Sequence, residues 1–199
     1  MRDNCRSGSN YIIDGASSNG QSQYKYLLNV CAPLLANQVT TNKGDIKSCP
    51  QTWEVCQVDL TYDLDPKELG SYPGDVVPTV LSRGHLLLNY TNGEMCVRKG
   101  VERHTAILLT CDQTAGVGKP VFIKEDEACG YTFEWKTAAA CPVKVAVSPS
   151  TKPPAPPTNC EVVDNANKMR YDLTALSKAT GNLRWSRELT DKQLINKYI

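Results

Sequence analysis

Regular alternation of apolar and polar side chains marks two segments of the chain as half-buried β-strands. In YTFEWKT (residues 131–137), three aromatic side chains alternate with polar ones. YKYLLNVC (residues 24–31) alternates in a similar way. A repeat of two residues is the spacing at which strand side chains point to opposite faces of a sheet. Both segments are therefore predicted strands.

Shorter signals predict further strands and the turns between them. Residues 84–97 read GHLLLNY, TNG and EMCV, which is typical of a hairpin with its turn at TNG. In residues 97–111 a polar loop leads into an apolar strand, and PVFIKE (residues 120–125) follows a glycine-containing loop. Helical periodicity is not sustained except in ELTDKQLINKYI at the C-terminus. We therefore expect an all-β fold, either a sandwich or a flattened barrel.

Composition changes after Cys141 and suggests a division of the chain. Residues 148–159 are rich in proline, which is typical of an extended linker. We therefore expect a domain in residues 1–147, a linker in residues 148–159 and the incomplete start of a second unit in residues 160–199. Cys160 would belong to that second unit.

Nine cysteines in 199 residues indicate an oxidising compartment. Structural zinc sites use close CxxC pairs, and the sequence contains none; Cys49 and Cys56 are the nearest pair. The two histidines do not supply the missing ligands, so no metal is expected. Eight bridged cysteines, with Cys160 left for the following unit, account for the odd number. Asn89 begins the glycosylation sequon NYT, which fits passage through the secretory pathway.

Charge balance and missing motifs argue against several classes of function. A net charge of +1 gives no reason to expect binding to nucleic acid or to an anionic membrane. The chain shows no apolar signal-peptide region and no apolar run long enough to span a bilayer, so we expect a piece of a larger protein. Motifs such as GxSxG and HExxH are absent, and GVGK (residues 116–119) lacks the spacing of a phosphate loop. We expect neither an enzyme nor a cofactor.

Four segments resemble the mannose 6-phosphate receptor homology family. They are CQV at 56–58, NYTNGEMC at 89–96, ERHTAILLTC at 102–111 and CGYTFEWKTAAACP at 129–142. The likeness covers roughly residues 5–145 and is greatest to the extracytoplasmic repeats of cation-independent mannose 6-phosphate receptors. YDLTALSK, after Cys160, resembles the start of the next repeat.

The resemblance implies a flattened β-barrel of two antiparallel sheets that is stapled by disulfides. Many pairings of the cysteines are open to the sequence alone. The resemblance implies the four pairs Cys5–Cys31, Cys49–Cys56, Cys96–Cys129 and Cys111–Cys141.

The resemblance also implies a set of residues that contact the hydroxyls of a mannose ring. These are Gln57, Arg103, Glu125 and Tyr131, each near the family's distance from a cysteine. The carboxylate is the open position, because one extra residue precedes the next cysteine after PVFIKE. Asp126 and Glu127 therefore stay as substitutes for Glu125.

The chemistry of these residue types suits a sugar. Each mannose hydroxyl can donate and accept a hydrogen bond. A guanidinium supplies donors, a carboxylate supplies a charge-assisted acceptor, an amide supplies one of each, and a phenol supplies either. Such a site rejects an epimer, because a misplaced hydroxyl leaves buried polar groups unpaired.

Phosphate recognition is a separate expectation. The resemblance places the phosphate near the loop between Cys96 and Arg103, where Arg98 and Lys99 supply cations. Two alternatives stay open: these cations are solvated loop charges, or they accept a phosphomonoester or a phosphodiester.

The function implied by the resemblance is that of a carbohydrate-binding receptor repeat. It would recognise mannose 6-phosphate on the N-glycans of lysosomal enzymes for sorting, in the lumenal or extracellular part of a receptor that moves between Golgi, endosome and cell surface. The alternative is a non-lectin repeat that binds a protein similar to insulin-like growth factor II, or that only spaces its neighbours. An intact Gln, Arg, Glu and Tyr set favours the lectin.

Overall fold

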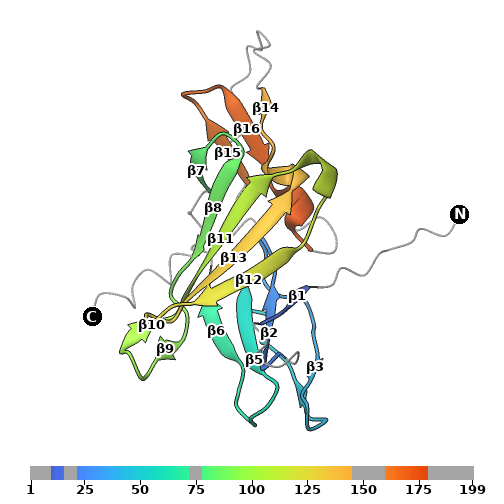
Figure 1. Cartoon of the computed structure of the whole chain (residues 1–199), viewed down its shortest axis with the longest axis vertical. Coiled ribbons are helices and arrows are strands. Elements are labelled where there is room, and N and C mark those ends of the chain that lie inside the picture. Colours follow the sequence, from blue (N-terminus) through green and yellow to red (C-terminus); the bar gives the residue numbers. More distant parts are fainter. Residues whose placement is uncertain (1–9, 16–21, 72–77, 145–159, 179–199) are drawn as a thin grey trace, which may run out of the picture.

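The computed structural model describes residues 10–15, 22–71, 78–144 and 160–178, which form an all-β fold (Figure 1). The strands are β1 (Tyr11–Asp14), β2 (Tyr24–Leu28), β3 (Val39–Thr40), β4 (Ile46–Lys47), β5 (Val55–Asp59), β6 (Lys67–Gly70), β7 (Thr79–Ser82), β8 (His85–Tyr90), β9 (Met95–Cys96), β10 (Val101–Glu102), β11 (His104–Cys111), β12 (Pro120–Glu125), β13 (Gly130–Thr137), β14 (Val143–Lys144), β15 (Glu161–Asp164) and β16 (Met169–Asp172). Short 3-10 helices are η1 (Gln113–Ala115), η2 (Ala138–Ala140) and η3 (Thr174–Leu176). The expected all-β, disulfide-bonded fold class is confirmed.

Two sheets form the body of the fold. The four-stranded sheet has the order β1-β2-β5-β6, and its neighbouring strands are antiparallel. The five-stranded sheet has the order β12-β13-β11-β8-β7. It is antiparallel except between β11 and β13, which run parallel because β12 occupies the edge and β13 returns between β12 and β11. The parallel pair brings the N-terminal ends of β11 and β13 to the same edge of the sheet.

The inner faces of the two sheets share one hydrophobic core. Tyr26 of β2 faces this core, whereas its neighbour Leu27 faces a smaller cluster on the other side of the four-stranded sheet. The three aromatic side chains of YTFEWKT also point inward and are almost fully buried. The Tyr26 ring stacks on Phe122 of β12 at a centroid distance of 4.6 Å. Full burial of one large apolar side chain stabilises a fold by about 1.5–3 kcal/mol, so the predicted alternation supplies much of the contact between the sheets.

Two seams join the edges of the sheets into a flattened barrel. On one side β1 lies against β12. On the other side Ser71 and Thr91 form an antiparallel bridge between the ends of β6 and β8. Gly70 permits this second seam: its φ is +130°, and a Cβ atom there would lie 2.7 Å from the carbonyl oxygen of Tyr90. A side chain would prevent so close an approach of the two backbones.

The hairpin expected in residues 84–97 is wrong. β8 pairs with β7 and β11, whereas β9 pairs with β10. After β8 the chain crosses to the four-stranded sheet, where the amide of Glu94 donates to the carbonyl oxygen of Glu68 at 3.0 Å. The amide of Gly93 donates to the carbonyl oxygen of Arg103, also at 3.0 Å. The TNG segment is therefore a crossing between sheets, held by hydrogen bonds to both.

Three of the four expected disulfides are confirmed, namely Cys49–Cys56, Cys96–Cys129 and Cys111–Cys141. The fourth expectation, Cys5–Cys31, is wrong. Cys31 is bonded to Cys160, with the two Cα atoms 5.6 Å apart. Cys5 lies outside the described residues.

Packing of residues 160–178 against the barrel explains why Cys160 reaches Cys31. β14, β16 and β15 form a three-stranded sheet in that order. Val162, Tyr171 and Leu173 are buried in the same hydrophobic core as the two main sheets. The amide of Lys178 donates to Asn29 Oδ1 at 2.8 Å, directly beside the segment that carries Cys31.

This packing bears on where the domain ends. Residues 160–178 and the two main sheets share a core and a disulfide, although composition suggested a break between them. We propose that the domain continues at least to residue 178. The proline-rich segment 148–159 and residues 179–199 lie outside the described part of the chain.

Candidate functional site

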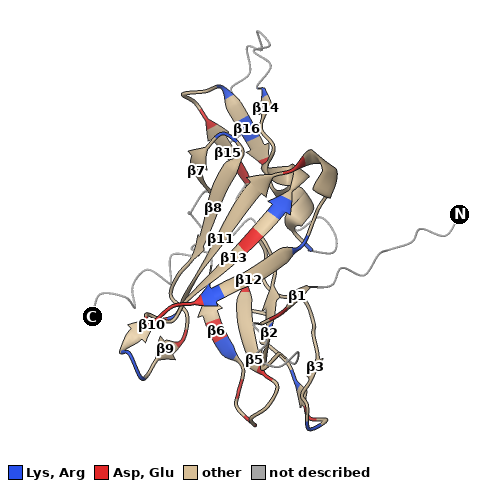
Figure 2. Ribbon diagram, in the orientation of Figure 1, with Lys and Arg blue, Asp and Glu red and all other residues tan. Residues whose placement is uncertain are grey.

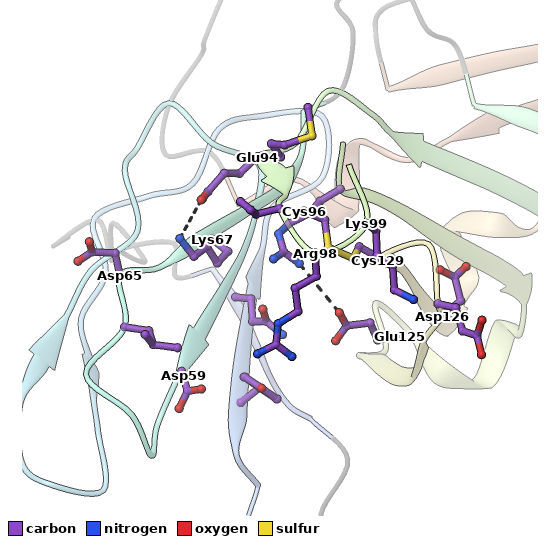
Figure 3. A pocket seen from close by; sticks show the side chains of 17 residues that line it. Asp59, Asp65, Lys67, Glu94, Cys96, Arg98, Lys99, Glu125, Asp126 and Cys129 are labelled. Atoms are coloured by element: carbon purple, nitrogen blue, oxygen red, sulfur yellow. Dashed lines mark hydrogen bonds and ion pairs between the residues drawn. A yellow bond between two sulfur atoms is a disulfide. The ribbon is translucent and has the colours of Figure 1, made fainter. Parts of the chain in front are cut away.

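A pocket of about 490 Å³ opens where β5, β6 and the β9–β10 hairpin meet the C-terminal end of β12 (Figure 3). Its walls include Gln57, Arg103 and Glu125 of the expected mannose set, and both Arg98 and Lys99 of the expected phosphate contacts. Acidic and basic residues are present on these same elements (Figure 2).

Arg103, Tyr131 and Glu125 form a chain of hydrogen bonds beside the pocket. Arg103 directly precedes β11, and the parallel register sets Thr105 opposite Tyr131 of β13. The Tyr131 hydroxyl accepts from Arg103 Nη1 at 2.5 Å and donates to Glu125 Oε1 at 2.8 Å. The same Arg103 nitrogen lies 4.0 Å from Glu125 Oε1. One hydroxyl therefore holds a cation and an anion side by side.

Tyr131 is the buried member of this chain. Its exposed fraction is 1%. Burial, followed by the nearby Glu125 carboxylate, raises the pKa of Tyr131 well above its usual range. The phenol therefore stays protonated at neutral pH and keeps the proton that it donates to Glu125.

Gln57 enters the pocket from the four-stranded sheet. It is buried in the middle of β5, and its Nε2 donates to the Tyr26 hydroxyl at 3.3 Å. The Tyr26 ring lies 6.0 Å from the Tyr131 ring between centroids. The structure therefore brings Gln57, Arg103 and Glu125 to one pocket, with Tyr131 behind them linking Arg103 to Glu125.

A β-bulge in β12 decides which carboxylate faces Tyr131. Phe122 pairs with Phe133, but Lys124 pairs with Thr132, so Ile123 has no partner in the register. Simple alternation would put Phe122 and Glu125 on opposite faces. The bulge absorbs one extra residue and sets Glu125 opposite Tyr131.

The alternative carboxylates are placed differently. Asp126 Oδ1 accepts from the amides of Ala128 at 2.9 Å and Gly130 at 2.8 Å, so Asp126 caps the turn between β12 and β13. The hydrogen bond from the Gly130 amide lowers the pKa of Asp126. Glu127 is exposed and lines the pocket, and its carboxylate has no hydrogen bond to any described residue.

The β9–β10 hairpin carries Arg98 and Lys99 over the pocket. The disulfide between Cys96 and Cys129 ties this hairpin to the turn beside Glu125. Neither of the two cationic side chains makes an ion pair or a hydrogen bond within the part of the chain that the structure describes. Figure 3 shows the Arg98 side chain reaching into the space between Asp59 and Glu125.

Several lining residues were not identified from the sequence, among them Tyr24, Lys67 and Glu94. Tyr24 lines the pocket from β2, where its spacing indicated only a strand residue. Lys67 of β6 stands opposite Gln57 of β5 and forms an ion pair with Glu94 at 2.8 Å. Lys67 and Glu94 lie 27 residues apart in the chain, and nothing in the pattern connects them.

Other sequence predictions concern residues away from the pocket. Asn89 of the sequon is exposed on β8, an orientation that suits a glycan. Among the residues described by the structure, no group of three or more His, Cys, Asp or Glu side chains is arranged to hold a metal ion. The described part of the chain likewise contains no helix with the length and hydropathy of a membrane span.

Sequence comparison identifies related proteins. A family profile described as the cation-independent mannose-6-phosphate receptor repeat matches residues 100–197. The human cation-independent mannose-6-phosphate receptor is 30% identical over 162 residues. This match covers 80% of the chain but only 6% of the receptor, so the chain spans a small part of that relative's length.

Solved structures of lower identity are also similar. Chicken IGF2R domain 11 matches at a TM-score of 0.47 and 24% identity, covering 67% of this chain and 78% of that chain. Domain 11 of the echidna IGF2R receptor matches at 0.44 and 20%, covering 70% and 83%. The MRH domain of Yos9, complexed with alpha3,alpha6-Man5, matches at 0.37 and 16%, covering 60% and 72%.

The profile match includes two of the segments quoted above, residues 102–111 and 129–142, and the profile and the relative are described as a receptor repeat and a receptor rather than as enzymes. The chain belongs to the family of cation-independent mannose-6-phosphate receptor repeats.

Proposed function

We propose that this repeat is a lectin that binds mannose 6-phosphate, as a monoester or a diester, on N-glycans of lysosomal enzymes. One observation carries the proposal: the hydrogen-bonded chain of Arg103, Tyr131 and Glu125 meets Gln57 at a single pocket. These residues come from both main sheets. The stability of the fold alone does not require polar side chains of both sheets to meet at one pocket, whereas binding of a polar ligand does.

The unused hydrogen-bonding capacity of the set matches the edge of a mannose ring. Arg103 has five N–H donors, of which one engages Tyr131. Glu125 Oε1 accepts from Tyr131, and Oε2 has no partner among the described residues. The Nε of Arg103 is buried. The remaining terminal N–H donors of Arg103 and the free Glu125 oxygen are complementary to vicinal hydroxyls, each of which donates and accepts.

Arg98 and Lys99 support the phosphate part of the proposal. Both are cations without a carboxylate partner in the described structure, and both line the pocket that contains Arg103. Charge-assisted hydrogen bonds from these side chains would engage phosphate oxygens.

The cellular role follows as part of the same proposal. Four disulfides suit a lumenal or extracellular domain, and the exposed Asn89 of the sequon suits a glycoprotein. We propose that the repeat belongs to a receptor that transports lysosomal hydrolases between Golgi, endosome and cell surface. Its partners would be the phosphomannosyl glycans of those hydrolases and neighbouring repeats of its own chain.

A glycan array tests the lectin proposal. The full chain should bind high-mannose glycans that carry phosphomonoesters or phosphodiesters, and Arg103→Ala should abolish that binding. Arg83→Ala is the matched control, because Arg83 is an exposed arginine in the turn between β7 and β8, outside the pocket lining. Absence of glycan binding, or equal binding by wild type and Arg103→Ala, would contradict the proposal.

A protein-binding repeat is the second candidate. Leu64, Met95 and Val97 line the pocket rim while remaining 52%, 48% and 86% exposed. Such apolar side chains are suited to a protein surface. If the array is negative, binding of a protein similar to insulin-like growth factor II, lost on changing Val97 to aspartate, would favour this candidate.

A further inference from the structure

The pocket has no excess of positive charge. Six carboxylates line it, from Asp59, Asp65, Glu94, Glu125, Asp126 and Glu127. Four cationic side chains accompany them, from Lys67, Arg98, Lys99 and Arg103. An anion that enters this pocket is therefore accepted or rejected by the placement of individual charges rather than by a general positive field.

Several of these charged side chains are already committed to the fold. Asp59 Oδ1 accepts from the amides of Thr61 at 2.7 Å and Tyr62 at 2.8 Å. Asp126 caps the next turn in the same way. Arg103 and Glu125 hold the hydroxyl of Tyr131. Asp59 and Asp126 therefore cannot move toward a ligand without breaking local structure, and Arg103 and Glu125 would meet a sugar from fixed positions.

Lys67 and Glu94 are in a different situation. Their ion pair at 2.8 Å joins β6 to the segment that leads into the β9–β10 hairpin, and their side chains are 35% and 40% exposed. A half-exposed ion pair is weak, because water and salt screen it. A ligand can therefore replace one of the partners at little cost.

The backbone fixes Glu94 beside the proposed sugar contacts. The Glu94 amide donates to Glu68, and the Arg103 amide donates to the Glu94 carbonyl oxygen at 3.1 Å. Lys67 stands opposite Gln57 in the register of β5 and β6. In Figure 3 the Lys67–Glu94 pair and Glu125 lie on opposite sides of the Arg98 side chain. The pair thus borders the space that Arg98 enters.

We propose that Glu94 and Lys67 set the selectivity of this pocket for phosphate. Glu94 occupies Lys67 and adds a negative charge next to the ligand, so it lowers the affinity for a phosphorylated mannose. Lys67 is a latent phosphate contact that becomes available when Glu94 is neutralised. This inference rests on the proposed lectin function and names the residues that control its preference for charge.

Opposite effects of two neutral variants test the proposal. The affinities of Glu94→Gln, Lys67→Gln and the double variant would be measured by calorimetry for three ligands: methyl mannoside, mannose 6-phosphate and mannose 6-(methyl phosphate). Glu94→Gln should raise the ratio of phosphorylated to neutral affinity roughly three- to tenfold, and Lys67→Gln should lower it by a similar factor. The double variant should lie near the wild type.

The pH dependence of the affinity distinguishes an electrostatic role of Glu94 from a purely structural one. A phosphomonoester carries its second charge only above a pKa of about 6. The gain from Glu94→Gln for mannose 6-phosphate should therefore be larger at about pH 7.5 than at about pH 5. The methyl phosphodiester keeps one charge at both pH values, so its gain should not change.

Asp65→Asn is the matched control, because it removes a pocket carboxylate that has no ion pair with a described residue. It should change the ratio less than Glu94→Gln does. The proposal is overturned if both single variants lower the ratio, or if neither moves it while Arg103→Ala still abolishes sugar binding. If the wild type binds none of the three ligands, the lectin proposal fails together with this one.

Discussion

Tyr131 joins the hydrophobic core to the proposed binding site. Its ring packs in the interior with the other inward residues of β13, while its hydroxyl lies between Arg103 and Glu125. Packing of the ring fixes the phenol in place, so that its hydroxyl orients both charged partners. Because the phenol is already fixed, it loses no further rotational freedom when a ligand binds. The same side chain therefore serves stability through the ring and recognition through one oxygen atom.

Tyr131→Phe separates these two roles. The ring stays buried, so the free energy of unfolding should fall by only about 1 kcal/mol, whereas mannose affinity should fall about 10- to 100-fold as Arg103 and Glu125 lose their common partner. Calorimetry with the sugar and thermal unfolding would measure the two effects. Tyr171→Phe is the control. The buried hydroxyl of Tyr171 accepts from the amide of Gly84, which lies in the turn between β7 and β8, outside the pocket. Equal loss of affinity in both variants would contradict this role for Tyr131.

Asp126 acts on the turn beside Glu125, and its effect depends on pH. A pKa that is lowered in the folded state means that the ionised carboxylate stabilises the fold above its usual pKa of about 4. That contribution is lost as the pH falls through the lowered value. Asp126→Asn should therefore have a lower melting temperature than the wild type at about pH 7, and the difference should shrink as the pH falls below about 4. A difference that persisted at acid pH would point to geometry rather than charge.

Individual residues differ in how far the sequence reveals them. The burial of the Tyr131 ring follows from alternation, whereas its expected polar role came from the resemblance to the receptor family. The ion pair of Lys67 and Glu94 has no such signal, because it depends on how β6 meets the chain after β8. Contacts that two sheets create between distant segments leave no periodic trace in either segment.

The β-bulge at Ile123 lets β12 place Phe122 and Glu125 on the same side of the strand. Glu125 follows Phe122 by three residues, yet both side chains are needed on the inner side of β12. A regular strand cannot provide this. One extra residue shifts the phase of the strand, so that Phe122 stacks on Tyr26 and Glu125 still meets Tyr131.

Deleting Ile123 should leave the site intact. The bulge would close, with Phe122 still opposite Phe133 and Glu125 still opposite Tyr131, so sugar affinity should change less than about threefold. Inserting one glycine between Lys124 and Glu125 should instead turn Glu125 away and abolish binding. Both variants would be compared on the same glycan array. Loss of binding in the deletion variant would show that Glu125 depends on the bulge itself.

The strands themselves were predicted better than the pairing between them. Alternation identified both β2 and β13 as strands, and in β13 it also identified the buried face. The expectation of a half-buried β2 was wrong, because Leu27 is buried in a second cluster on the other side of the sheet. The pairing of β11 with β13 was not visible, since parallel neighbours are joined by a crossing strand and not by a turn. The prediction for the TNG segment was wrong because its composition suits a turn, whereas its hydrogen bonds show that it crosses between the two sheets.

At the scale of the whole molecule, the disulfide between Cys31 and Cys160 joins segments 129 residues apart. It ties the end of β2 to the strand pair β15–β16, which lies at the opposite end of the fold from the β9–β10 hairpin (Figure 1). A change in composition suggested a boundary before Cys160. A change in composition predicts a linker, but it does not predict whether the residues after the linker pack into the same hydrophobic core as the residues before it.

The double variant Cys31→Ala/Cys160→Ala tests this arrangement. A cross-link over so long a loop stabilises a domain by about 2–4 kcal/mol, mainly by restricting the unfolded chain, so the variant should unfold at correspondingly lower denaturant concentration. Sugar affinity measured well below the melting temperature should stay within about twofold, because the pocket lies at the other end of the barrel. Peptide mapping of the oxidised wild type should recover a peptide containing Cys31 linked to one containing Cys160. Recovery of Cys31 linked to Cys5 would instead return Cys160 to a separate unit. The C-terminal strands would then be held by burial of Val162, Tyr171 and Leu173 and by hydrogen bonds such as the one from Lys178 to Asn29.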